Sequence, residues 1–126
     1  ADTTGMANPK QITETIAFFR QHLPKTSLCL HLHNNRGIAM ANLYAGHLAG
    51  VTMFDTSLGG IGGCPNVPQA AGNLATEDAV FMFESMGLDT GLQIPSLIKA
   101  ARLLEKILDR PLPGQVMKSG PVELAG

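Results

Sequence analysis

Short apolar runs alternate with amphipathic segments along most of this chain of 126 residues, and few folds accommodate such an alternation. Residues 27–33 and 51–55 have the length and composition of strands, and each follows a segment whose apolar residues recur at helical spacing. A strand, a helix and a second strand in this order form a right-handed crossover, which makes the two strands parallel. The sequence therefore predicts an α/β fold with a parallel sheet.

Four helices are expected around these strands. Asn8 and Pro9 begin the first helix, because asparagine is a favoured N-cap and proline a favoured first helical residue, and Pro24 ends it. The other three helices are expected at residues 38–49, 76–87 and 96–108, and residues 111–114 are expected to be irregular.

Charge and composition exclude several classes of protein. Nine Lys and Arg against ten Asp and Glu give a net charge of -1, which argues against a basic nucleic-acid surface and a polybasic membrane surface. With 44% hydrophobic residues the chain is too apolar to be disordered, yet it has no apolar run of about 18 residues that could span a membrane. Its two cysteines cannot make a disulfide scaffold. We therefore expect a soluble protein of a reducing compartment, the bacterial cytoplasm or the mitochondrial matrix.

Polar side chains gather where the expected strands end. His31 and His33 are two residues apart at the end of the strand 27–33, so their imidazoles point to the same face. Asp55 ends the next strand, and Asp2 fits the end of a preceding one. Active sites of α/β proteins lie at such carboxyl ends, and paired imidazoles are common metal ligands. Two hydrogen-bonded histidines without a metal remain the alternative interpretation.

A long glycine-rich loop is the second candidate element. Residues 57–72 contain Gly59, Gly60, Gly62 and Gly63 directly before Cys64. Loops of this length in a compact domain are usually functional, and glycine lets the backbone approach a ligand closely. A cysteine near a metal or an imidazole loses its proton more readily and can transfer protons. The other cysteine, Cys29, lies in an apolar run, and we expect it to be buried.

Four segments together resemble the hydroxymethylglutaryl-CoA lyase family. They match it in content, order and spacing: Asp2-Thr3-Thr4-Gly5, His31-Leu32-His33-Asn34, Asp55 to Pro65, and Gly72 to Asp78. The resemblance extends from Asp2 to the helix that ends near Leu108. The Gly-Gly-x-Gly-Gly-Cys-Pro loop is specific to the lyases, because the related isopropylmalate and homocitrate synthases keep the His-x-His and Gly-Asn motifs without that cysteine.

The resemblance implies an α/β fold that is the C-terminal portion of a (β/α)8 TIM barrel, about strands 6 to 8 with their helices. Residues 1–126 would form one partial catalytic domain, with residues 94–126 as its terminal helix and tail. A whole barrel has eight strands and about 250 residues, so this portion is incomplete. We expect the chain alone to be inactive. We also expect it to form a homo-oligomer or to need the missing N-terminal half of the barrel, because open strand edges invite pairing.

The resemblance also implies a set of site residues. His31, His33 and Asn73 would bind a divalent cation, Mg or Mn, a choice that suits imidazole and oxygen ligands. Cys64 would be the catalytic thiol, carried on a flexible loop with Gly59, Gly60, Gly62 and Gly63. Asp2 would be an active-site acid, and His31 belongs to the catalytic group with it.

Two further residues, Glu77 and Asn34, would contact the metal ligands without binding the metal themselves. Glu77 follows Asn73 by four residues, although an acid in the first turn of a helix explains it equally well. Asn34 follows the His-x-His motif, where the family usually has Asp. Asn66 likewise replaces the aromatic residue that usually follows the Cys-Pro pair. These two departures leave the identity of the substrate open.

The activity implied by the resemblance is cleavage of a carbon–carbon bond. An acyl-CoA substrate, 3-hydroxy-3-methylglutaryl-CoA or a similar 3-hydroxyacyl-CoA, would give acetyl-CoA and acetoacetate, and the metal would stabilise the enolate. Such an enzyme serves leucine catabolism and ketone-body metabolism. Two alternatives remain: a metal-dependent condensing synthase acting on acyl-CoA and 2-oxoacids, and a non-catalytic fragment or association module.

Overall fold

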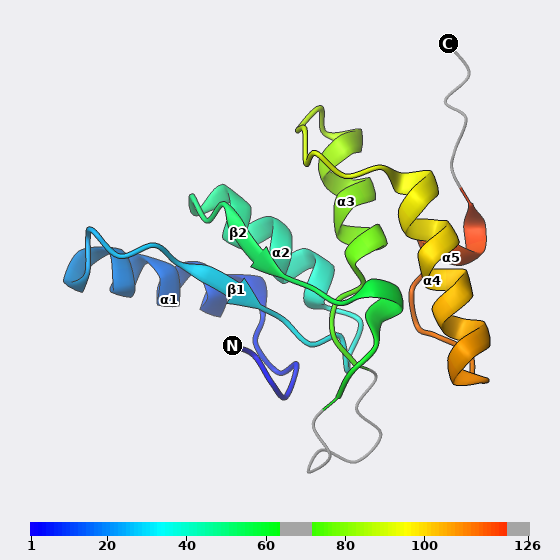
Figure 1. The fold of residues 1–126 in the computed structure, drawn as a ribbon. Helices are drawn as coiled ribbons and strands as arrows, with labels where there is room; N and C mark the ends of the chain where they lie inside the picture. Colours follow the sequence, from blue (N-terminus) through cyan, green and yellow to red (C-terminus); the bar gives the residue numbers. More distant parts are fainter. Residues whose placement is uncertain (64–71, 121–126) are drawn as a thin grey trace. The chain divides into compact units, whose positions relative to one another are not determined.

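The computed structural model of the chain describes residues 1–63 and 72–120 and divides it into two compact units (Figure 1). The first unit comprises Ala1–Asp55 and Gly63–Asn73, and the second comprises Thr56–Gly62 and Leu74–Gly126. In the first unit the elements are α1 (Pro9–His22), β1 (Cys29–His31), α2 (Ala39–Leu48) and β2 (Met53–Asp55). In the second they are the 3-10 turn η1 (Leu58–Gly60), α3 (Thr76–Ser85), α4 (Ile94–Leu108) and α5 (Val116–Ser119).

The sheet of the first unit is parallel, as the order of the elements predicts. Cys29, Leu30 and His31 of β1 pair with Met53, Phe54 and Asp55 of β2. A further parallel bridge joins Asp2 to Leu32, directly after β1. The regular ladder covers only three residues of each strand, fewer than the runs 27–33 and 51–55 that we expected. The chain thus brings Asp2, β1 and β2 side by side.

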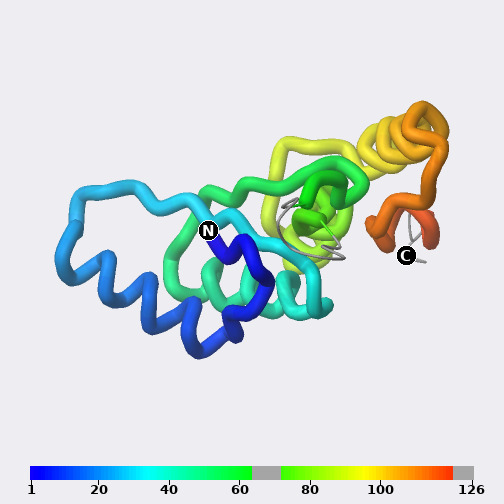
Figure 2. The backbone as a smooth tube through the Cα atoms, turned by 90° about the horizontal axis from the view of Figure 1, so that it is seen from below, coloured from blue at the N-terminus to red at the C-terminus, as the bar shows by residue number. Residues whose placement is uncertain are grey.

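The helices α1 and α2 lie next to each other on one face of this sheet (Figures 1 and 2). Asn8 caps α1 as predicted, because its side chain accepts from the backbone N–H of Gln11 while the Gln11 side chain accepts from the backbone N–H of Asn8, both at 3.0 Å. Of the apolar residues at helical spacing in α1, only Ile12 and Ile16 are buried. Gly46 of α2 lies directly against Leu30, where a β-carbon would overlap the leucine side chain.

The opposite face of the sheet carries Cys29, His31, Met53 and Asp55, since alternate strand residues share a face. No described helix of this unit covers that face. Cys29 is exposed there, and so is Met53, its neighbour across the ladder. The expectation of a buried Cys29 was therefore wrong, because the apolar run around it packs on α2 through Leu30 rather than through the cysteine.

The second unit packs α3, α4 and α5 around a small core. Ala101, Leu112 and Met117 are its buried centre. Asp78 of α3 accepts backbone hydrogen bonds from Gln115 at 3.0 Å and from Val116 at 2.7 Å, which holds the start of α5. The sequence did not predict α5. The described part of the chain contains no helix long and apolar enough to cross a membrane.

Candidate functional site

The two histidines at the end of β1 converge. Their Nε2 atoms are 3.0 Å apart, and the ring centroids are 5.0 Å apart with an interplanar angle of 60°. His33 is buried, with 6% of its surface exposed, whereas His31 is partly exposed. The two-residue spacing thus places both imidazoles on one face, as expected from the geometry of a strand. Nitrogen atoms this close can share a proton or ligate one cation.

The hydrogen bond to Asp55 determines which ring nitrogen of His31 carries the proton. The register of the sheet pairs His31 with Asp55, and Oδ2 of Asp55 is 2.8 Å from Nδ1 of His31. A carboxylate only accepts hydrogen bonds, so the imidazole proton lies on Nδ1 and the lone pair of Nε2 faces His33. Hydrogen bonds of this kind orient metal-binding histidines and fix which ring nitrogen carries the proton. Sequence reasoning placed Asp55 at a strand end but did not assign it to the site, since only the strand register identifies its partner.

The surroundings of His33 favour its neutral form. Burial lowers the pKa of His33 below the usual value for an imidazole, and the neighbouring His31 lowers it further. Asp2 acts in the opposite direction and raises the pKa of His33. Since burial is the largest of these effects, His33 is kept neutral, which is the form of the imidazole that binds metals.

Asp2 lies beside the histidines through its backbone. Its N–H donates to the carbonyl of His31 at 2.9 Å, and its carbonyl accepts from the N–H of His33 at 3.4 Å. Its carboxylate accepts from the backbone N–H groups of Met6 and Ala7, both at 3.1 Å. The structure thus places Asp2 at the strand end predicted for it, where its carboxylate also closes a turn.

Two asparagines border the histidines. Asn73 forms an antiparallel bridge with His33, so residues 40 positions apart in the sequence adjoin here. Asn34 donates its backbone N–H to the carbonyl of Gly72 at 3.0 Å, while its side-chain oxygen accepts from the N–H of Ala39 at 3.1 Å. Asn34 therefore binds the start of α2, a structural contact that its position after the His-x-His motif does not reveal.

Glu77 is a buried acid of the second unit. Its side chain is fully buried, and Oε2 accepts from the N–H of Gly59 at 2.9 Å. Burial raises the pKa of Glu77; the hydrogen bonds from the N–H groups of Gly59 and of Glu77 itself oppose that shift, and Asp78 adds to it. Oε1 has no hydrogen-bond partner among the described residues. The described contact of Glu77 is therefore with η1.

The first glycines of the expected loop are ordered and buried. Gly59 and Gly60 form η1 with positive φ angles of 65° and 71°. A β-carbon on Gly59 would also meet the side chain of Leu112. The loop thus begins as a packed turn, and Gly62 and Gly63 after it are exposed. Cys64 and Asn66 lie outside the described residues.

The donor set fits part of a metal shell. Among residues 1–63 and 72–120, no three His, Cys, Asp or Glu side chains are grouped so that they could hold a metal ion. The set implied by the sequence contains only two such side chains, His31 and His33, together with the amide of Asn73. The converging Nε2 atoms fit two positions of an octahedral shell, and the amide chemistry of Asn73 fits a third.

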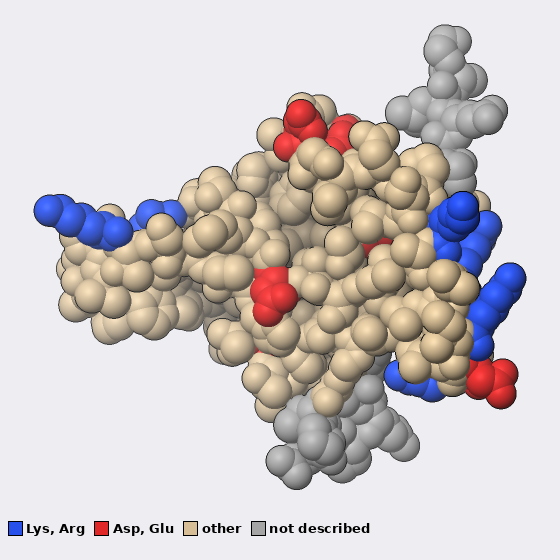
Figure 3. All heavy atoms as spheres, viewed as in Figure 1, with Lys and Arg blue, Asp and Glu red and all other residues tan. Residues whose placement is uncertain are grey.

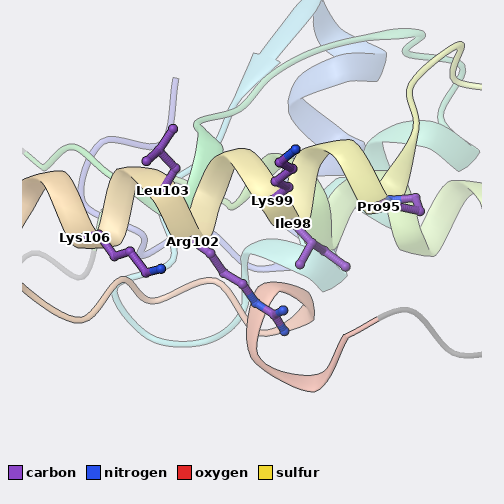
Figure 4. A pocket seen from close by; sticks show the side chains of 6 residues that line it. All are labelled: Pro95, Ile98, Lys99, Arg102, Leu103 and Lys106. Atoms are coloured by element: carbon purple, nitrogen blue, oxygen red, sulfur yellow. The ribbon is translucent and has the colours of Figure 1, made fainter.

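The second unit carries a hollow on its surface. A cavity of about 460 Å³ follows the surface of α4 and is lined by Pro95, Ile98, Lys99, Arg102, Leu103 and Lys106 (Figure 4). Basic side chains gather over this part of the second unit (Figure 3). Arg102 uses its Nε to donate to the carbonyl of Met117 at 2.8 Å. All the lining residues belong to one helix, so the hollow is a surface groove that contains none of the predicted site residues.

The HMGL-like family model matches residues 1–104. The chain belongs to the HMGL-like family. It is 46% identical over 122 residues to the (R)-citramalyl-CoA lyase of Chloroflexus aurantiacus, a match that covers 97% of this chain and 38% of that protein. It is 41% identical over 121 residues to the hydroxymethylglutaryl-CoA lyase YngG of Bacillus subtilis, covering 94% of this chain and 40% of that protein.

Solved structures of lyases in this family have the same fold. The HMG-CoA lyase of Bacillus subtilis aligns with a TM-score of 0.88 and 39% identity over 94% of this chain and 40% of that one. An HMG-CoA lyase of Acinetobacter baumannii, solved in complex with coenzyme A and 3-methylmalate, aligns with a TM-score of 0.90 and 39% identity over 98% of this chain and 41% of that one.

These findings confirm the family resemblance and the α/β fold. They also give the extent of the match, because the chain spans about 40% of the length of the HMGL-like family members it matches. The architecture described above thus corresponds to a part of the barrel of these lyases. The relatives are lyases named for CoA thioesters, and they include bacterial and mitochondrial proteins.

Proposed function

We propose that the chain carries one side of the active site of a metal-dependent lyase that cleaves a 3-hydroxyacyl-CoA. The observation that carries this proposal is the convergence of the His31 and His33 Nε2 atoms at 3.0 Å beside Asp2, in a chain 41–46% identical to two acyl-CoA lyases. In barrel terms the chain corresponds to about strands 6 to 8 with their helices, and the remaining strands would complete the site.

His31 and His33 would hold a divalent cation, Mg or Mn, through their Nε2 atoms, and Asn73 would add its side-chain oxygen. Asp55 supports this assignment because it keeps the His31 proton on Nδ1 and leaves Nε2 free to bind. When bound, such a cation acts as a Lewis acid toward the oxygen on which the enolate charge develops. His31 would belong to the catalytic group through the cation that it would hold.

The chain's own residues would move the protons. The Asp2 carboxylate takes the proton of the 3-hydroxyl group, whose oxygen then forms a carbonyl while the C2–C3 bond breaks. The electron pair of that bond passes to the thioester as an enolate. The Cys64 thiol donates a proton to its C2 and gives acetyl-CoA. With 3-hydroxy-3-methylglutaryl-CoA as the substrate, the other product is acetoacetate.

The substrate is an acyl-CoA of either of two related kinds. The relatives include a lyase named for (R)-citramalyl-CoA and others named for hydroxymethylglutaryl-CoA, and one HMG-CoA lyase structure contains coenzyme A. Both compounds are tertiary 3-hydroxy thioesters, so the same bond breaks. The described contacts of Asn34 are to α2 and to Gly72, so its role is structural. An asparagine at this position is therefore compatible with either substrate.

The test uses the full-length protein that contains this chain. With Mn present, it is expected to release acetyl-CoA from one of the two thioesters, and His33→Ala is expected to abolish release. Cys64→Ala separates the lyase from a condensing synthase, because it should disable cleavage and leave a condensation largely unaffected. Release of acetyl-CoA at the wild-type rate by His33→Ala would refute the proposal. Absence of release by the wild-type protein would refute it as well and leave the condensing synthase or the non-catalytic association module.

A further inference from the structure

A buried asparagine lies on the inner side of α2. Asn42 has no exposed surface, and the other buried residues of the helix are Ala39, Leu43 and Gly46. An amide among apolar and small side chains destabilises the fold unless its hydrogen-bonding groups have partners. The Nδ2 group of Asn42 has one, since it donates to the carbonyl of Ala7 at 2.8 Å. The Oδ1 atom has no hydrogen-bond partner among the described residues.

The carbonyl that Asn42 holds belongs to the turn that Asp2 closes. Ala7 donates its own N–H to Oδ2 of Asp2, and Met6 donates to Oδ1. The Asp2 backbone in turn pairs with His31 and His33. Two hydrogen bonds, Asn42 to Ala7 and Ala7 to Asp2, therefore connect the interior of α2 to the carboxylate beside the histidines.

The same turn is held at a second carbonyl. Asn35 donates to the Thr4 carbonyl at 3.3 Å, and Nη1 of Arg36 donates to it at 2.8 Å. Gly5 lies so close to the segment after β1 that an added β-carbon would be 3.0 Å from the carbonyl oxygen of His33. Arg36 is exposed, so water can replace its bond. No water can replace the bond from the buried Asn42, which makes it the critical contact.

The geometry assigns Asn42 as a positioning residue that fixes the carboxylate of Asp2 relative to His33. This inference rests on the proposed function, in which Asp2 accepts the substrate proton. Leucine branches at Cγ as asparagine does and is somewhat larger, and it carries neither the donor to Ala7 nor an unpartnered oxygen. What the amide adds is the bond to Ala7, and through it the orientation of Asp2.

The first measurement needs neither metal nor substrate. Amide hydrogen exchange of Met6 and Ala7, followed by NMR in the chain, reports whether these two groups stay bonded to Asp2. Asn42→Leu is expected to speed their exchange at least tenfold relative to wild type. Val51→Ala is the matched control, because Val51 is buried in the same unit and its backbone N–H donates to the carbonyl of Gly46 in α2, away from the Asn42–Ala7 hydrogen bond. Asn42→Ala serves as a second variant should leucine prevent folding.

The second measurement is kinetic and uses the full-length protein. Asn42→Leu is expected to lower kcat about tenfold with little change in KM, since second-layer contacts typically contribute a factor of this size. In an Asp2→Asn background the same substitution should have no further effect, because the group that it positions has already been changed.

The outcomes separate this inference from the function. Exchange of Met6 and Ala7 in Asn42→Leu no faster than in Val51→Ala overturns the inference. Faster exchange together with an unchanged kcat overturns it as well, because the turn would then be held without consequence for the reaction. A wild-type protein without lyase activity refutes the proposed function, and the exchange result alone then decides whether Asn42 positions Asp2.

Discussion

The hydrogen bond between Asp55 and Nδ1 of His31 orients the imidazole so that Nε2 faces His33. Oδ2 of Asp55 is 2.8 Å from Nδ1 and accepts its hydrogen bond, and an asparagine there would accept more weakly or donate instead. We therefore expect Asp55→Asn to weaken Mn binding about tenfold, measured by titration calorimetry or by the electron paramagnetic resonance signal of free Mn.

Asp109→Asn is the matched control for that substitution. Asp109 is exposed at the end of α4 with a φ of 48°, a conformation that asparagine adopts readily. The Asp109→Asn substitution removes the same charge as Asp55→Asn, at a position outside the candidate site. Equal Mn affinity of Asp55→Asn and Asp109→Asn would contradict the role given to Asp55.

Glu77 gives a prediction on pH and stability. Because burial raises the pKa of Glu77, the folded protein binds more protons than the unfolded chain between the two pKa values. The contribution of Glu77 to the free energy of unfolding therefore falls as the pH rises above the ordinary pKa of a glutamate. Glu77→Gln keeps an oxygen for the N–H of Gly59 and cannot ionise.

We expect Glu77→Gln to be more stable than wild type at pH 7 by about 1 kcal/mol, and the advantage to shrink toward pH 4. Thermal unfolding at several pH values measures this difference. Glu14→Gln is the control, since Glu14 is exposed and pairs with Lys10 in α1. An advantage of Glu77→Gln that is the same at pH 4 and pH 7 would show that ionisation is not its cause.

What the sequence predicts at this scale depends on how far apart the interacting residues are. The shared face of His31 and His33 follows from a spacing of two residues within one strand. The pairing of His31 with Asp55 requires the register of the sheet, and the contact of Asn42 with Ala7 joins residues 35 positions apart. Local periodicity carries no information on such pairs, so both residues were found only in the structure.

Among the elements, η1 shows why a glycine-rich segment need not be open chain. Gly59 has a φ of 65°, and a methyl group there would meet Leu112, which is buried. We expect Gly59→Ala to destabilise the protein by about 1–3 kcal/mol, since both left-handed backbone strain and overpacking oppose it. Thermal or urea unfolding measures the loss.

Gly91→Ala separates the two causes of that loss. Gly91 has a similar φ of 70°, but an added β-carbon would meet no atom within 4 Å. It therefore reports the backbone strain alone, and the difference between the two variants measures the overlap with Leu112. Equal losses in Gly59→Ala and Gly91→Ala would mean that Leu112 moves aside without cost.

The elements were predicted more reliably than their ends. All four expected helices are present, and α1 begins at Pro9 because its capping box is a local signal. The strands are shorter than expected, because a ladder requires a partner that the apolar run alone does not reveal. The helix α5 was missed because Asp78, 38 residues before Val116, holds its start. Distant side chains thus set the boundaries that sequence patterns do not.

On the scale of the whole molecule, the chain corresponds to only part of the length of the lyases that it matches. The chain aligns over nearly its full length with about 40% of each HMG-CoA lyase chain. In the part that the structure describes, its sheet has two regular strands with a bridge to Asp2, and two strands cannot close on themselves as a barrel does. Phe18, Phe19 and Leu23 near the end of α1 are exposed as well.

Strand edges and apolar side chains left open in this way favour association with a further chain. We expect the isolated chain to be oligomeric in light scattering. Co-expression with the N-terminal part of the Bacillus subtilis relative is expected to replace this self-association by a one-to-one complex, because the added strands would occupy the same edges.

Titration calorimetry should then show tighter Mn binding by the complex than by the chain alone, since a cation that prefers six ligands would gain the donors that His31, His33 and Asn73 do not supply. A matched complex that carries His33→Ala controls for Mn bound elsewhere. A monodisperse monomer that melts cooperatively, with Mn affinity unchanged by the added part, would contradict this expectation and favour an independent association module.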